Sequence, residues 1–234
     1  MVRDLHDEGH DRSDRVGTSL ASNIAPPGVE MPVKPAVSVI VGRDTADGLE
    51  VFVQHRVTTM DFAAGVLVYP GGRVDPQDHE MGAALELPSD ILDSHVRAWS
   101  KTELGGDPEF AKALIATAQR EVGEEAGATI AATALKPWAN WITPPGRTRR
   151  FDTYFYVARG EEIGDLRHQT TEATNSEWMN VEHILAEEAA ERLKLMRPTL
   201  VLLNEVHRFG SVEALMSAER DIEPVRPFAP GKHG

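Results

Sequence analysis

Three glutamates near the middle of the chain are the residues best suited to chemistry. They lie in the segment Arg120-Glu121-Val122-Gly123-Glu124-Glu125-Ala126-Gly127. On a helix, Glu121, Glu124 and Glu125 fall at about 0°, 300° and 40° around the axis, so they share one face. Mutual repulsion on that face costs a few tenths of a kcal/mol, which a divalent cation would offset. Because magnesium is commonly shared between carboxylates and substrate phosphates, the segment predicts a magnesium site that acts on phosphates, with manganese as an alternative ion.

The alternative interpretation of the same segment is a solvated acidic helix face that ends at a glycine. The complete pattern of Arg, Glu, an aliphatic residue, a Glu pair and Gly should arise by chance in on the order of 10⁻⁴ chains of this length. Arg120 could brace one of the carboxylates through a bidentate hydrogen bond. The sequence therefore favours the metal site, with Arg120 as a supporting residue.

The elements that must position these glutamates can be read from the flanking sequence. Asp107 is suited to an N-cap and Pro108 to a first helical position, so a helix is expected over Glu109–Ala126, ending at Gly127. Before it, strands are expected at Ala36–Val41, Glu50–Gln54 and Gly65–Tyr69. After it, strands are expected at Thr133–Leu135, Trp138–Thr143, Thr153–Val157 and Ser176–Met179, and helices at Val181–Leu195, Thr199–Phe209 and Val212–Glu219.

This order of elements predicts one α/β domain with a mixed sheet between helices. The domain is expected over residues 34–222, after a flexible arm at 1–33 and before a Pro-rich tail at 223–234. Residues 76–106 are expected to form an inserted, partly helical flap that leaves the sheet after Gly72 and returns at Asp107.

The run from Arg120 to Gly127, together with Gly71-Gly72 upstream, resembles the Nudix box of the Nudix hydrolase superfamily. Gly72 lies 48 positions before Arg120, whereas the usual separation is about 14, so an insertion within the box is implied. Asp75 occupies a commonly acidic place. The resemblance implies an α/β/α sandwich with extra C-terminal helices, in which the three glutamates ligate magnesium beside the backbone carbonyl of Gly71 or Gly72.

A general base is also required, because water must be activated to attack phosphorus. Glu124 and Glu125 are candidates. Glu172 is a third, because several Nudix enzymes carry a loop carboxylate at a similar place. An exposed loop glutamate with no role in the reaction is the alternative interpretation of Glu172.

A second resemblance concerns the substrate. The run from Arg56 to Gly65 keeps the spacing of a motif in coenzyme A diphosphatases, although Asp61 stands where a second Arg is usual. Three further runs are similar to a long-insertion Nudix branch that includes a peroxisomal acyl-coenzyme A diphosphatase: Trp138–Pro144, Arg149–Thr153 and Pro198–Leu200. The residues that these resemblances and their charges suggest for substrate binding are Arg56, Arg73, Trp141, Arg149, Arg150 and Phe151. In the alternative interpretation, Trp138 and Trp141 are core residues of a strand and the arginines form a solvated edge.

The expected function is therefore a diphosphatase that acts on coenzyme A or on an acyl-coenzyme A. Diphosphatases of ADP-ribose, dinucleotides or nucleotide sugars are the enzymatic alternatives, because the Nudix box contacts only the diphosphate and other loops bind the rest of the substrate. A non-catalytic Nudix-fold module that binds a nucleotide is an alternative from another class, disfavoured by three intact carboxylates.

Composition excludes several other classes. The net charge of −13 argues against nucleic acid as a partner, since phosphate backbones are bound by Lys and Arg clusters. The chain has no cysteine, which excludes disulfides and thiolate chemistry. No apolar run approaches a membrane span, so a cytoplasmic location, a small nucleotide-like ligand and no membrane partner are expected. A homodimer remains open.

Overall fold

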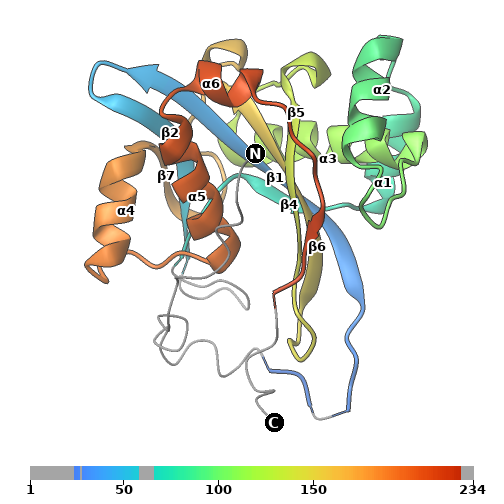
Figure 1. Ribbon diagram of the computed structural model, residues 1–234, viewed down its shortest axis with the longest axis horizontal. Coiled ribbons are helices and arrows are strands. Elements are labelled where there is room, and N and C mark those ends of the chain that lie inside the picture. The colour runs from blue at the N-terminus through green and yellow to red at the C-terminus, as the bar shows by residue number, and fades with distance from the viewer. Residues whose placement is uncertain (1–23, 27, 58–65, 228–234) are drawn as a thin grey trace, which may run out of the picture.

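Strands rich in β-branched and aromatic residues form one mixed sheet (Figure 1). The computed structural model describes residues 24–26, 28–57 and 66–227. The strands are β1 (Val33–Thr45), β2 (Gly48–Arg56), β3 (Leu67–Val68), β4 (Gly71–Arg73), β5 (Lys136–Ile142), β6 (Arg150–Arg159), β7 (Ala173–Asn180) and β8 (Pro224–Val225). Their order is β3-β2-β1-β6-β5-β8, with β4 paired to β1 and β7 paired to β2.

The two central strands are parallel, and most of their neighbours are antiparallel. β1 pairs with β6 from Val33 opposite Arg150 to Gly42 opposite Arg159. β2 and β4 both run antiparallel to β1, and β4 places Gly71 opposite Ser38 and Gly72 opposite Val37. The Gly-Gly pair is therefore fixed beside the centre of the sheet.

Helices cover both faces of the sheet, which confirms the predicted α/β fold (Figure 1). The helices are α1 (Pro76–Ala83), α2 (Ser89–Ala98), α3 (Pro108–Ala126), α4 (Val181–Ala189), α5 (Arg197–Phe209) and α6 (Val212–Ser217). The first three form one layer and the last three form the other. Within the described residues, no helix has both the length and the apolarity to cross a membrane.

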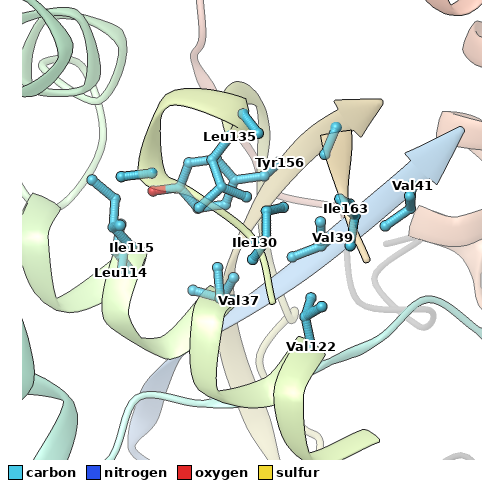
Figure 2. Packing of buried hydrophobic residues seen from close by; sticks show 14 of the residues in the cluster. Val37, Val39, Val41, Leu114, Ile115, Val122, Ile130, Leu135, Tyr156 and Ile163 are labelled. Atoms are coloured by element: carbon cyan, nitrogen blue, oxygen red, sulfur yellow. The ribbon is translucent and has the colours of Figure 1, made fainter. Parts of the chain in front are cut away.

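The larger core cluster lies between α3 and the sheet. Figure 2 shows Val37, Val39 and Val41 of β1 facing Leu114 and Val122 of α3. A second buried cluster lies on the other face, where α4, α5 and α6 pack on β1, β2, β5 and β6. The sheet is therefore buried on both sides, and α3 is held rigidly against it.

The caps of α3 match the prediction from its flanking residues. The Asp107 carboxylate accepts a hydrogen bond from the Glu109 amide at 3.0 Å, and Pro108 is the first helical residue. Gly127 ends the helix in the left-handed conformation with φ 65°.

The inserted segment is helical, as expected, but it is packed into the α3 layer rather than standing apart as a flap. Gly82 of α1 lies so close to α3 that a Cβ there would be 2.7 Å from the Ala113 nitrogen. Trp99, at the end of α2, is 0% exposed and makes edge contacts with the rings of Tyr154 and Tyr156. The insertion thus completes the core.

Other local expectations differ from the structure. Thr133–Leu135 was expected to be a strand, but Ala132–Ala134 forms a 3-10 helix, because a run of small residues this short offers a sheet little to pack. The helix expected to reach Leu195 ends at Ala189, where the chain turns through Glu191 at φ 60°. Pro224 and Val225, expected in the tail, add to β5. Residues 1–23 of the expected arm, and Asp61, lie outside the described residues.

Candidate active site

Strand β4 meets the last two turns of α3 at the Gly-Gly pair. The Gly71 amide donates a hydrogen bond to Glu125 Oε2 at 2.9 Å. A Cβ on Gly72 would lie 2.1 Å from Glu121 Oε1, so any larger residue there would collide with this carboxylate. A Cβ on Gly71 would lie 2.2 Å from the Val37 carbonyl oxygen. Both glycines are therefore required for the strand to pass between β1 and the glutamates.

The two inward-facing glutamates are buried carboxylates. Burial raises the pKa of Glu121, with Arg120 opposing the shift. Burial raises the pKa of Glu125 to about 7, and the nearby Glu121 adds to the shift, whereas the Gly71 amide and Arg56 oppose it. Glu124 is different, because 60% of its side chain is exposed. Charge on Glu121 and Glu125 is thus penalised in this structure, and a nearby cation would relieve that penalty.

Arg120 is the central cation of the site. Its Nε and Nη2 donate to the two oxygens of Asp78 at 2.8 and 2.9 Å, and Nη1 donates to Glu121 at 2.8 Å and Glu124 at 3.0 Å. Nη2 also donates to the Arg73 carbonyl at 3.0 Å. The guanidinium therefore ties α1, β4 and α3 together and orients two of the three glutamates.

Arg56 and Glu172 form the other side of the site. Arg56 Nη2 lies 3.2 Å from Glu172 Oε2, and the charges of both residues act on Glu125. The Val57 amide donates to the Glu172 carbonyl, so this loop is also tied to the end of β2. A guanidinium and a second carboxylate thus lie near Glu125.

Comparison with known proteins agrees with this arrangement. The family model described as NUDIX domain matches residues 92–200. The matched segment is therefore similar to a Nudix domain. The match starts inside the insertion, downstream of Gly71-Gly72, and covers the glutamates of α3. It supports placing the chain in the Nudix superfamily.

Individual relatives point the same way. The chain is 28% identical over 203 residues to "Putative nudix hydrolase 7" of Caenorhabditis elegans, covering 83% of this chain and 66% of that relative's length. The crystal structure of a NUDIX hydrolase from Alicyclobacillus acidocaldarius is similar with a TM-score of 0.63 and 24% identity, covering 84% of this chain and 99% of that one. The structural likeness confirms the Nudix fold. The relative and the solved structure are both named as Nudix hydrolases.

Nudix enzymes generally use divalent metal ions such as magnesium. The three glutamates of α3 fit such an ion chemically, because their carboxylate oxygens are hard ligands and two of these carboxylates, Glu121 and Glu125, are buried. In the described part of the chain, however, no three acidic or histidine side chains are grouped to hold a metal. Arg120 bridges Glu121 and Glu124 instead.

Several of the residues proposed for substrate binding lie away from the glutamates of α3. Trp141 is buried on the opposite face of the sheet, in the cluster with α5, which favours the core interpretation. Phe151 alternates with Arg150 along β6 and so points to that opposite face too. Arg149 is exposed beside the β5–β6 connection, and Arg150 lines a separate pocket. Arg73 contributes its carbonyl to Arg120, and its exposed side chain lies 3.8 Å from Asp75.

Asp78 is the important residue that sequence reasoning missed. Asp75 was named as the acidic residue after the glycines, but Asp75 precedes α1 and its amide donates to Asp78 Oδ2 at 2.8 Å. Asp78 is the residue that binds Arg120. The sequence did contain a clue, because Asp78 is a second aspartate six positions after Gly72. The long separation between Asp78 and Arg120 hid their relation.

Proposed function

We propose that the chain is a magnesium-dependent hydrolase that cleaves the diphosphate linkage of a nucleoside diphosphate joined to a second group. The observation that carries this proposal is the seating of Glu121 and Glu125 against Gly71-Gly72. Two buried carboxylates side by side are costly unless a cation or proton compensates them. A metal that also binds the substrate's phosphates meets this requirement.

Each residue then has a role that follows from its contacts. Glu121, Glu124 and Glu125 would hold the ion, which when bound neutralises phosphate charge and lowers the pKa of a water. Arg56 offers a guanidinium to a phosphate oxygen, as its geometry suits bidentate binding. Glu172, held by Arg56, is a carboxylate that could take the proton from water, with Glu124 and Glu125 as the alternatives.

The first experiment is a turnover assay of the full chain with magnesium, over coenzyme A, acyl-coenzyme A, ADP-ribose, NADH and dinucleoside polyphosphates, with products identified by mass. Glu124→Gln and Glu125→Gln should keep the fold and lower turnover by about 10²-fold or more. Glu109→Gln is the matched control, because Glu109 is exposed at the other end of α3. Near-full activity of both site variants, or no turnover of any diphosphate by the unaltered chain, would reject the proposal and favour a binding module.

For the substrate, we propose coenzyme A or an acyl-coenzyme A, on the strength of the motif around Arg56. Asp61 lies outside the described residues, so its direction must be tested chemically. If Asp61 faces the pocket, its charge would repel a phosphate by about 1 kcal/mol at 4 Å in bulk water and about 4 kcal/mol near a protein surface. Asp61→Arg should then improve catalytic efficiency toward coenzyme A more than toward ADP-ribose. An equal change for both would show that this position does not read coenzyme A.

A further inference from the structure

A pocket of about 410 Å³ opens on the α3 side of the sheet, at the start of α3. It is surrounded by the beginning of β1, the end of β5, the beginning of β6, the α2–α3 connection and Arg226 after β8. Its walls include the apolar side chains of Leu104, Phe110 and Ile142. The volume falls in the range of pockets that hold small molecules.

This pocket is separate from the glutamates. Phe110 lies 11 residues before Glu121 on α3, which corresponds to about 16 Å along the helix axis. Helix α1 contacts both regions, since His79 packs against the Phe110 ring while the adjacent Asp78 binds Arg120. A ligand in the pocket would therefore lie apart from the proposed diphosphatase site.

The pocket contains one buried positive charge that neutral groups hold in place. Arg150 is 9% exposed, and it donates from Nε to the Thr143 carbonyl and from Nη1 to the Met31 carbonyl. The ion pair recorded for it in the described part of the chain is with Glu30, at 3.8 Å, whose side chain is 88% exposed. Such a distant and solvated partner compensates the guanidinium poorly.

The other charged groups of the pocket have closer partners than Arg150. Arg226 and Glu103 pair with each other at the surface. The two oxygens of Asp152 accept hydrogen bonds from Asn140 Nδ2 at 2.6 Å and from the Tyr154 hydroxyl at 2.9 Å. Asp152 keeps its own charge, but both of its oxygens already accept hydrogen bonds. Arg150 is therefore the charged group that a ligand can still bind, and an anion with an apolar body suits it.

We propose that this pocket binds a small monocarboxylate, with its carboxylate on Arg150 and its apolar body against Phe110, Leu104 and Ile142. Arginine matches the planar carboxylate, and the shallow apolar walls accommodate a short chain.

The test is a calorimetric or NMR titration of the full chain with hexanoate, compared with hexan-1-ol and hexylamine. Hexanoate should bind at least tenfold more tightly than either neutral or cationic analogue, as expected for a charge-assisted contact. Arg150→Gln should weaken hexanoate binding by about tenfold or more. Arg208→Gln is the matched control, since Arg208 is exposed on α5 in the other helical layer, and it should bind hexanoate like the unaltered chain.

Because Arg150 also holds the Thr143 and Met31 carbonyls, its replacement could impair folding. Leu104→Trp leaves Arg150 in place and fills the pocket, so it should abolish hexanoate binding while the melting temperature stays close to that of the unaltered chain. Three results would overturn the proposal: no hexanoate binding at millimolar concentration, tighter binding of hexylamine, or unchanged hexanoate binding in Leu104→Trp.

Discussion

Replacing Asp78 by Asn removes one charge from the clamp around Arg120 and changes little else in size. Asp78 is 0% exposed, and its two oxygens accept three hydrogen bonds: from Arg120 Nε, from Arg120 Nη2 and from the Asp75 amide. Asparagine has one acceptor oxygen, so its NH₂ group must face at least one of these donors. The variant therefore leaves a buried donor unpaired whichever way the amide turns.

The magnitude follows from these contacts. A hydrogen bond to a charged group contributes about 1.5–3 kcal/mol, and breaking a buried ion pair completely costs about 3–5 kcal/mol. Arg120 keeps Glu121 and Glu124, so the lower range applies. We expect Asp78→Asn to lower the free energy of unfolding by about 2–3 kcal/mol, which corresponds to roughly 5–10 °C in melting temperature for a chain of this size.

The assay is urea unfolding followed by circular dichroism, with Asp93→Asn as the control because Asp93 is exposed on α2. Burial by itself would raise the pKa of Asp78, but the bonds from Arg120 and the Asp75 amide bring it below its ordinary value of 3.8. Stability from a lowered carboxyl pKa is fully present above the unfolded value and is lost as pH falls through the folded value. The difference in free energy of unfolding between the unaltered chain and Asp78→Asn should thus be constant at pH 5–7 and become smaller below pH 3.8. A difference under about 0.5 kcal/mol at pH 7 would refute the role of the clamp.

Three further predictions follow from individual contacts. Gly71→Ala should lower the free energy of unfolding by about 3 kcal/mol or prevent folding, because its Cβ would meet the Val37 backbone. Gly72→Ala should lower the free energy of unfolding by about 1 kcal/mol and lower turnover at least tenfold, because its Cβ would displace Glu121. Thermal melts and turnover rates of both variants check this, and the reverse order of stability would contradict it. Lys136→Met should lower the free energy of unfolding by about 1–2 kcal/mol and speed amide hydrogen exchange in α6. The reason is that Lys136 Nζ donates to the Leu215, Met216 and Ala218 carbonyls at the end of that helix. Unchanged exchange would show that this cap is unimportant. Tyr154→Phe should lower the free energy of unfolding, measured with urea, by about 1–2 kcal/mol, because it removes a buried hydroxyl that donates to Asp152. An unchanged free energy of unfolding would argue against that hydrogen bond.

Local signals were enough to predict the element that carries the chemistry. Helix α3 has an N-cap, a proline at its first position and a glycine at its end, all of which act within a few residues. The three glutamates follow from helical spacing alone. The fold class followed from the order of strands and helices, because a sheet with apolar residues on both faces must be covered twice.

The residues that sequence reasoning misplaced depend on distant contacts. Trp138 and Trp141 are three positions apart, so regular alternation would put them on opposite faces of the sheet. A register shift between Pro137 and Ala139 brings both into the same core cluster, and no local signal marks that bulge. Similarly, Asp78 becomes significant only when α1 packs on α3, and the separation of 42 positions between Asp78 and Arg120 conceals this contact in the sequence.

The central parallel pair of strands also governs how the chain must assemble. Val33 of β1 meets Arg150 of β6, which lies 117 positions later, so the middle of the sheet closes only after a very long loop has been gathered. Contacts this remote slow folding, and until they form, one edge of β1 can pair with other chains. The entropy of closing a loop rises only with the logarithm of its length, by about 0.6 kcal/mol for each doubling. Residues 76–106 lie inside this loop and lengthen it by less than one such doubling, so they add little to the cost of closing it. In the folded protein the same segment supplies the buried Trp99 ring.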